Sequence, residues 1–119
     1  MRVLVCGGRD FDDASWLYSV LEELTEQQGI DTIIHGAATD ADTLASCWGL
    51  DFAAQVIAYP ADWEKHGQAA GPIRNQQMLD EGKPDLIVVF PGGLGTADMI
   101  RRAQAAGVRV LLPERGTET

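Results

Sequence analysis

The chain has 119 residues, of which 45% are hydrophobic and 23% charged, and its formal net charge is −9. These values are typical of one soluble globular domain and leave no room for a second core. The acidic balance repels a nucleic-acid backbone, and no basic cluster counteracts it, so nucleic acid is disfavoured as a partner. No apolar run reaches the roughly 18 residues of a membrane helix, and the first residues resemble a strand rather than a signal peptide, so we expect a cytoplasmic protein.

The first expected strand, residues 2–6, ends in the turn Gly7-Gly8-Arg9. A helix capped by Asp12 or Asp13 follows and stops at Gly29. The two adjacent glycines of the turn do not make the G-x-G-x-x-G dinucleotide fingerprint. They do form a glycine turn between a strand and a helix, with Arg9 beside it.

Two cysteines are present, Cys6 in this strand and Cys47 in a later expected helix. Their spacing matches no metal or redox motif, so we expect both to be reduced and buried, as small apolar side chains are. The sequence predicts neither a metal site nor a bound cofactor.

Small residues also follow the second expected strand, residues 32–34, where Gly36 lies in the turn. Thr39 or Asp40 can cap the helix that comes next. Asp42 lies in the first turn of that helix, where the helix dipole favours a carboxylate in any case. A structural role and a role in binding a ligand hydroxyl are both compatible with Asp42.

The third expected strand, residues 55–59, is followed by the longest segment without a predicted element, residues 60–71. Irregular segments of this length are often functional. Pro72 fits the first position of the next helix, which stops at Gly82.

Arg74 and Asn75 would then lie in the first turn of that helix, the end at which the dipole disfavours a cation. An arginine held there is explained if its planar guanidinium binds an anion such as phosphate. The alternative is a surface arginine paired with Asp62 or Glu64. We favour the ligand interpretation.

The fourth expected strand, residues 86–90, is a continuous apolar run typical of a strand buried on both faces. It ends in Pro91-Gly92-Gly93-Leu94-Gly95-Thr96, and a helix that stops at Gly107 follows. Amide groups at a glycine turn and a helix N-terminus attract anions, above all phosphate. The alternative is a tight turn in which Thr96 merely caps the helix.

With a fifth strand at residues 108–112, five strands alternate with four helices. The pattern predicts an α/β fold, a Rossmann-like doubly wound parallel sheet in the order 3-2-1-4-5 with helices on both faces. Residues 1–113 would form this single domain and residues 114–119 a short flexible tail. In that order the first and fourth strands are neighbours, so their glycine turns would line one crevice.

The P-G-G-x-G-T motif after a buried strand resembles the SLOG superfamily, which joins the LOG phosphoribohydrolases with Smf/DprA-like proteins. Further matching segments point to its small YspA/YpsA-related family: residues 5–11, 35–37 with 41–42, 60–63 and 71–75. The resemblance implies a Rossmann-like domain that binds a nucleotide or nucleotide derivative, often as a homodimer or higher homo-oligomer. In LOG enzymes an arginine and a glutamate cleave the N-glycosidic bond of a nucleoside 5′-monophosphate. The corresponding residues here would be Arg74 and Asp98, the latter one methylene shorter than glutamate.

Our leading hypothesis is a domain that senses or processes a nucleotide-derived ligand, with the phosphate on the P-G-G-x-G-T loop. The expected ligand-binding residues are Gly7, Gly8, Arg9, Gly36, Asp42, Arg74, Asn75, Pro91, Gly92, Gly93, Gly95 and Thr96. One rival is a LOG-like phosphoribohydrolase in which Arg74 and Asp98 are catalytic. A DprA-like nucleic-acid-binding module, which the charge disfavours, and a purely structural oligomer with an empty crevice are the others.

Overall fold

The computed structural model describes residues 1–38 and 40–114. One parallel sheet of five strands has the order β3-β2-β1-β4-β5. Its strands are β1 (Arg2–Cys6), β2 (Thr32–His35), β3 (Gln55–Ala58), β4 (Leu86–Val89) and β5 (Arg109–Leu111). The strand order and direction confirm the predicted Rossmann-like α/β fold.

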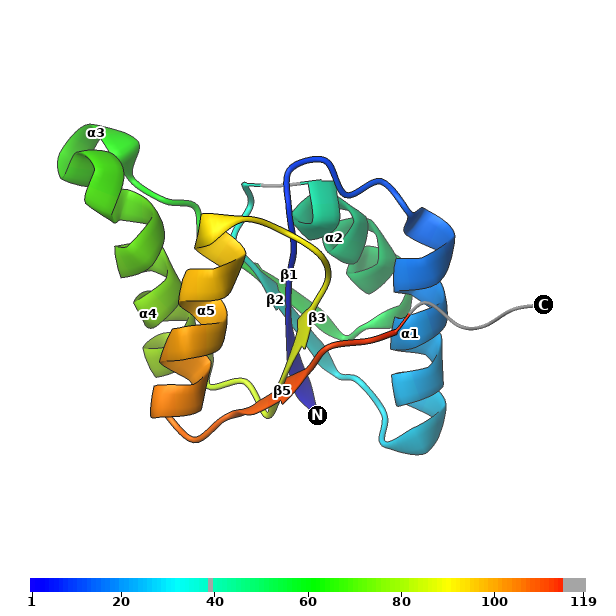
Figure 1. Ribbon diagram of the computed structural model, residues 1–119. Helices are drawn as coiled ribbons and strands as arrows, with labels where there is room; N and C mark the ends of the chain where they lie inside the picture. The colour runs from blue at the N-terminus through cyan, green and yellow to red at the C-terminus, as the bar shows by residue number, and fades with distance from the viewer. Residues whose placement is uncertain (39, 115–119) are drawn as a thin grey trace.

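Helices cover both faces of the sheet (Figure 1). They are α1 (Ala14–Gln27), α2 (Asp40–Phe52), the short α3 (Trp63–His66), the 3₁₀ turn η1 (Gly67–Ala69), α4 (Ala70–Gly82) and α5 (Leu94–Ala105). Alternate residues of β1 serve the two faces: Val3 and Val5 pack with α1 and α2, and Leu4 packs with α4 and α5. The apolar run of β4 is buried on both faces in the same alternating way, as the sequence predicts.

The helix ends agree with several sequence signals. The Asp13 carboxylate accepts the Trp16 amide at 3.0 Å and caps α1. Gly29 and Gly107 have φ of 78° and 75°, the left-handed backbone that ends a helix. Two expectations concern residues outside those that the structure describes. One is a helix cap by Thr39, and the other is the flexible tail at 114–119, of which only residue 114 is described.

Residues 60–71 differ from the prediction, because most of them are helical. Asp62 caps α3 by accepting the Lys65 amide at 3.0 Å, and η1 leads directly into α4. Helix α4 begins at Ala70, so Pro72 is not its first residue. Arg74 consequently lies beyond the first turn, and the expected dipole penalty on its charge is largely absent.

Cys47 also differs from the prediction. Its side chain is exposed on α2, whereas Cys6 is half-buried, and both thiols are free. A small side chain in an amphipathic helix gives no signal of which face it occupies when its neighbours are also small.

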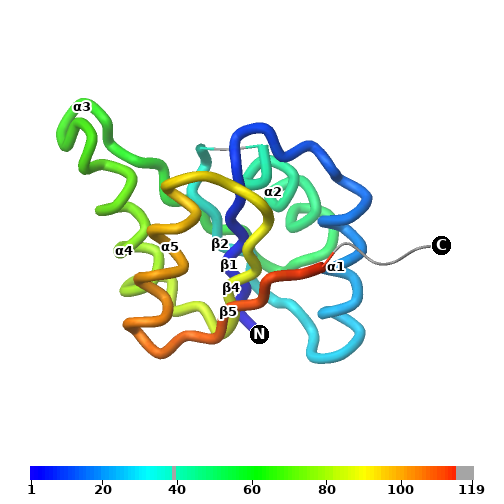
Figure 2. The backbone as a smooth tube through the Cα atoms, in the orientation of Figure 1, coloured from blue at the N-terminus to red at the C-terminus, as the bar shows by residue number. Residues whose placement is uncertain are grey.

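The turns after β1 and β4 lie side by side at the carboxyl end of the sheet (Figure 2). The Gly8 amide donates to the Pro91 carbonyl at 2.8 Å and ties the two turns together. The predicted convergence at the switch point of the strand order is thus confirmed. In residues 1–38 and 40–114, no helix has the length and apolar character that crossing a membrane requires.

Candidate functional site

A cavity of about 630 Å³ opens where the carboxyl ends of β1, β2 and β4 meet α4 and α5. This volume lies within the range of small-molecule sites. Most of the predicted site residues line it. The turns after β1 and β2, with the start of α2, contribute Gly7, Gly8, Arg9, Gly36 and Asp42. Helix α4 and the region around the start of α5 contribute Arg74, Asn75, Gly93, Gly95, Thr96 and Asp98.

Pro91 and Gly92 do not line this cavity but a neighbouring hollow of about 410 Å³. Their surroundings indicate a structural role. A Cβ on Gly92 would lie 2.7 Å from the Gly8 nitrogen and would also collide with the Thr96 side chain. Likewise, a Cβ on Gly8 would lie 2.9 Å from the Gly92 Cα. These two glycines let the turns after β1 and β4 approach each other.

Gly93 and Gly95 lie in a different environment. A Cβ on either would meet no protein atom within 4 Å, and neither has a positive φ. The protein's own packing therefore does not explain glycine at these two positions. Both line the cavity, so the space beside their backbone belongs to it.

The N-terminus of α5 has no side-chain cap. Its N-cap residue is Gly93, which has no side chain to accept a hydrogen bond, so the interpretation of Thr96 as the cap is wrong. The Ala97 amide reaches the Gly93 carbonyl at 3.0 Å. Within the described part of the chain, the amides of residues 94–96 donate to no acceptor. Three N–H groups and the positive end of the helix dipole are thus available to an acceptor from outside the protein.

Arg74 projects into the cavity from α4 and is half-buried. Its Nη1 donates to the Gly36 carbonyl at 2.5 Å and its Nε to Asn75 Oδ1 at 3.1 Å. It does not pair with Asp62 or Glu64, which removes the surface ion pair as an explanation. Burial lowers the pKa of Arg74, and the negative charge of Asp42 counteracts this.

Gly36 is needed for this placement of the arginine. A Cβ on Gly36 would overlap the Arg74 Nη1 and would lie 2.8 Å from its Cζ. The guanidinium therefore lies flat against a backbone without a side chain. Three of its five N–H groups have no acceptor among the described residues, since only two donate to protein atoms.

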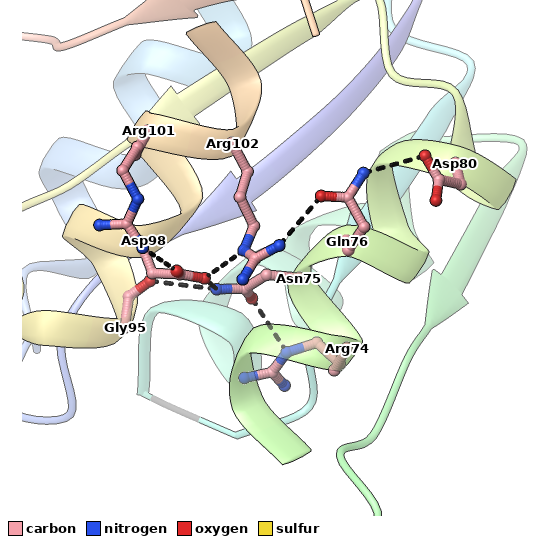
Figure 3. Close-up of polar contacts among 8 residues, drawn as sticks. All are labelled: Arg74, Asn75, Gln76, Asp80, Gly95, Asp98, Arg101 and Arg102. Carbon is pink, nitrogen blue, oxygen red and sulfur yellow. Dashed lines mark hydrogen bonds and ion pairs between the residues drawn. The ribbon is translucent and has the colours of Figure 1, made fainter. Parts of the chain in front are cut away.

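Asn75 connects Arg74 to α5 (Figure 3). Its Oδ1 accepts from Arg74, while its Nδ2 donates to the Gly95 carbonyl at 3.2 Å and to Asp98 Oδ2 at 3.0 Å. The amide of this buried side chain is thus engaged on both sides by the protein. Asn75 holds the arginine and the glycine turn in one fixed relation.

Asp98 anchors this connection from the first turns of α5 (Figure 3). Its carboxylate accepts from Arg101 Nη2 at 2.5 Å, from Arg102 Nε at 2.8 Å and from Asn75. Arg102 also donates to Gln76 Oε1 at 3.1 Å and so bridges α5 and α4. Burial raises the pKa of Asp98, but hydrogen bonds from Arg102 and Asn75 and the charges of both arginines outweigh it and leave the pKa low.

Cys6 and Asp42 line the same cavity. Burial, reinforced by the charge of Asp42 and partly offset by Arg74, raises the pKa of the Cys6 thiol to about 12. The thiol is therefore protonated near neutral pH and is a poor nucleophile. Asp42 Oδ2 accepts the Ala38 amide at 3.0 Å, which fixes the turn after β2.

Trp63, Gln68 and Leu94 also line the cavity, and the site prediction missed them. The first two lie in the segment for which no element was predicted. The capping aspartate immediately before Trp63 was the available signal for a helix there. Leu94 looks like an ordinary apolar residue of a helix start, and the sequence gives no sign of its exposure.

The described residues contain no group of three or more potential metal ligands. Residues 1–66 match a family model described as the YspA, cpYpsA-related SLOG family. The gene 61 protein of Mycobacterium phage D29 is 36% identical over 118 residues, an alignment covering 92% of this chain and 94% of that protein.

Proposed function

Because the chain belongs to the YspA, cpYpsA-related SLOG family, we propose that its cavity binds a nucleotide or nucleotide derivative with a phosphate at the N-terminus of α5. Membership of this family supports a nucleotide-related role, whether binding or processing. The ligand-binding role of individual residues is our inference from their positions.

The observation that carries the proposal is the pair Gly93 and Gly95 at an uncapped helix start. Neither glycine is required by a positive φ or by a packed neighbour, and both line the cavity. A phosphate close to the backbone explains both the missing side chains and the amides without acceptors. Arg74 supplies the second half of the site, because its remaining N–H groups form a planar fork that suits a phosphate.

The same geometry favours binding over hydrolysis of the N-glycosidic bond. A general acid needs a proton near neutral pH, and the low pKa of Asp98 leaves its carboxylate ionised. Its oxygens already accept three hydrogen bonds from protein side chains, which also makes it a weak base. We therefore assign Asp98 to holding Asn75 and α5 in place rather than to catalysis.

Calorimetric titration with AMP tests the proposal. Arg74→Ala should weaken binding about 10- to 100-fold, which corresponds to about 1.5–3 kcal/mol for hydrogen bonds to a charged group. Arg74→Lys should recover only part of the loss because lysine lacks the planar fork. The matched control is Arg109→Ala, which removes an exposed arginine at the far end of the sheet.

Chromatography of the same mixtures distinguishes binding from hydrolysis. We expect AMP to be recovered intact. Release of adenine that is lost in Asp98→Asn would contradict our assignment and establish the hydrolase instead. Failure of AMP and of ribose 5-phosphate to bind at millimolar concentration would refute the nucleotide site altogether.

A further inference from the structure

Trp63 is an exposed aromatic side chain that lines the cavity. Its side chain is 53% exposed, although it lies in a locally well-defined segment. The Asp62 cap fixes the start of α3, and Gly67 with φ of 56° ends it. A Cβ on Gly71 would lie 3.6 Å from Trp63 Cη2, so the indole edge lies near the backbone at the start of α4.

Leu94 is a second exposed apolar side chain at the same cavity. It is the first residue of α5 and is 91% exposed. Single exposed apolar residues are common and usually need no explanation. Among the described residues, however, six large apolar side chains are exposed, and these two both line the cavity proposed to hold the ligand.

The two residues belong to different walls. Trp63 is on α3, which continues through η1 into α4, and Leu94 is at the start of α5 (Figure 1). Leu94 is also next to Gly93 and Gly95, where the phosphate is placed. The cavity thus combines polar side chains that suit a phosphate with apolar side chains that are exposed to solvent.

We propose that Trp63 and Leu94 form an apolar clamp that takes the planar base of the nucleotide, with the base stacked on the indole. This inference rests on the proposed function and names the part of the ligand that the phosphate site leaves unassigned. Stacking on an aromatic ring is tolerant of base identity because every base has a π-face. The larger purine covers more of the apolar surface, so purine nucleotides should bind more tightly than pyrimidine nucleotides.

The test compares AMP with ribose 5-phosphate, which carries the same phosphate and sugar but no base. Wild type should bind AMP at least tenfold more tightly. Trp63→Ala should weaken AMP about 10- to 100-fold, as expected for one stacked base, and leave ribose 5-phosphate unchanged. Trp63→Phe should retain most of the affinity for AMP. Leu94→Ala should weaken AMP by a smaller factor.

Matched controls are Phe52→Ala and Leu50→Ala, exposed apolar residues of α2 outside the cavity, which should leave AMP binding unchanged. Tryptophan fluorescence gives a direct readout, because Trp48 is buried and Trp16 is only partly exposed. AMP should quench the wild type, and Trp63→Phe should abolish most of this change, whereas ribose 5-phosphate should cause little.

The outcomes separate the two proposals. If ribose 5-phosphate binds as tightly as AMP, or if Trp63→Ala weakens both equally, the clamp is wrong and the phosphate site stands. If Arg74→Ala weakens both ligands and Trp63→Ala weakens AMP alone, both proposals hold. If neither ligand binds the wild type, both are overturned.

Discussion

At the scale of single residues, the glycines divide by what a side chain would meet. Gly8 and Gly92 bring two turns together, Gly36 gives space to an arginine, and Gly93 and Gly95 face the open cavity. The sequence predicts all of these positions as ligand-binding residues. It does not distinguish glycines required by packing from glycines that leave room for a ligand, because that difference depends on neighbours distant in the chain.

Gly36→Ala tests how the arginine is positioned. The added Cβ would displace the Arg74 guanidinium, which is the flexible end of a long side chain, and Gly36 has no positive φ. We therefore expect a loss of stability below about 1 kcal/mol but a fall in AMP affinity similar to that of Arg74→Ala. Calorimetric titration and urea unfolding measure the two effects. Unchanged affinity would show that the arginine does not need this contact.

At the scale of elements, the sequence predicts the strands well but predicts the short helix and the helix start beside the cavity less accurately. A continuous apolar run identifies β4, because both faces of this strand are covered. Helix α3 is only four residues long, too short for hydrophobic periodicity to reveal it. The Thr96 hydroxyl is a plausible cap by residue type, yet the helix begins two residues before it.

Because Asp98 links α4 and α5, its ionisation makes the stability of the protein depend on pH. Its folded pKa lies below that of an unfolded aspartate, about 3.9, so its ion pairs contribute fully above that value. Their contribution is lost as the pH falls through about 4 toward the lower folded pKa.

We expect Asp98→Asn to reduce the free energy of unfolding by about 2 kcal/mol at pH 7. The difference from wild type should persist at pH 5 and narrow at pH 3.5. Urea unfolding at the three pH values measures it. The control is Asp80→Asn, which should change stability by less than about 0.5 kcal/mol. Asp80 is an exposed carboxylate on α4 whose one partner among the described residues is Gln76. A difference for Asp98→Asn that is the same at every pH would rule out this account.

At the scale of the whole molecule, strand order brings the parts of the site together. Residues from the turns after β1, β2 and β4 are far apart in the chain and meet only because β1 lies between β2 and β4. Alternation of strands and helices with right-handed crossovers predicts this arrangement from the sequence. It does not predict which side chains turn into the cavity, and Trp63 and Leu94 were therefore missed.

The net charge of −9 leads us to predict that the protein does not bind nucleic acid. We expect no retardation of single- or double-stranded DNA in a gel-shift experiment, even at low salt, because acidic surface repels the phosphate backbone. A shifted band that appears at low salt and disappears at moderate salt would show that a local basic surface overrides the total charge.

Gly95→Ala tests the central claim most directly. A Cβ at this position meets no protein atom within 4 Å and lies in a helix, so the variant should be as stable as wild type or up to about 1 kcal/mol more stable. If a phosphate lies against this backbone, the same methyl group should weaken both AMP and ribose 5-phosphate at least about tenfold. Titration of both ligands, alongside thermal unfolding, gives the answer. A stable variant with impaired binding is the predicted result, and a stable variant that binds both ligands as wild type does would contradict the phosphate site.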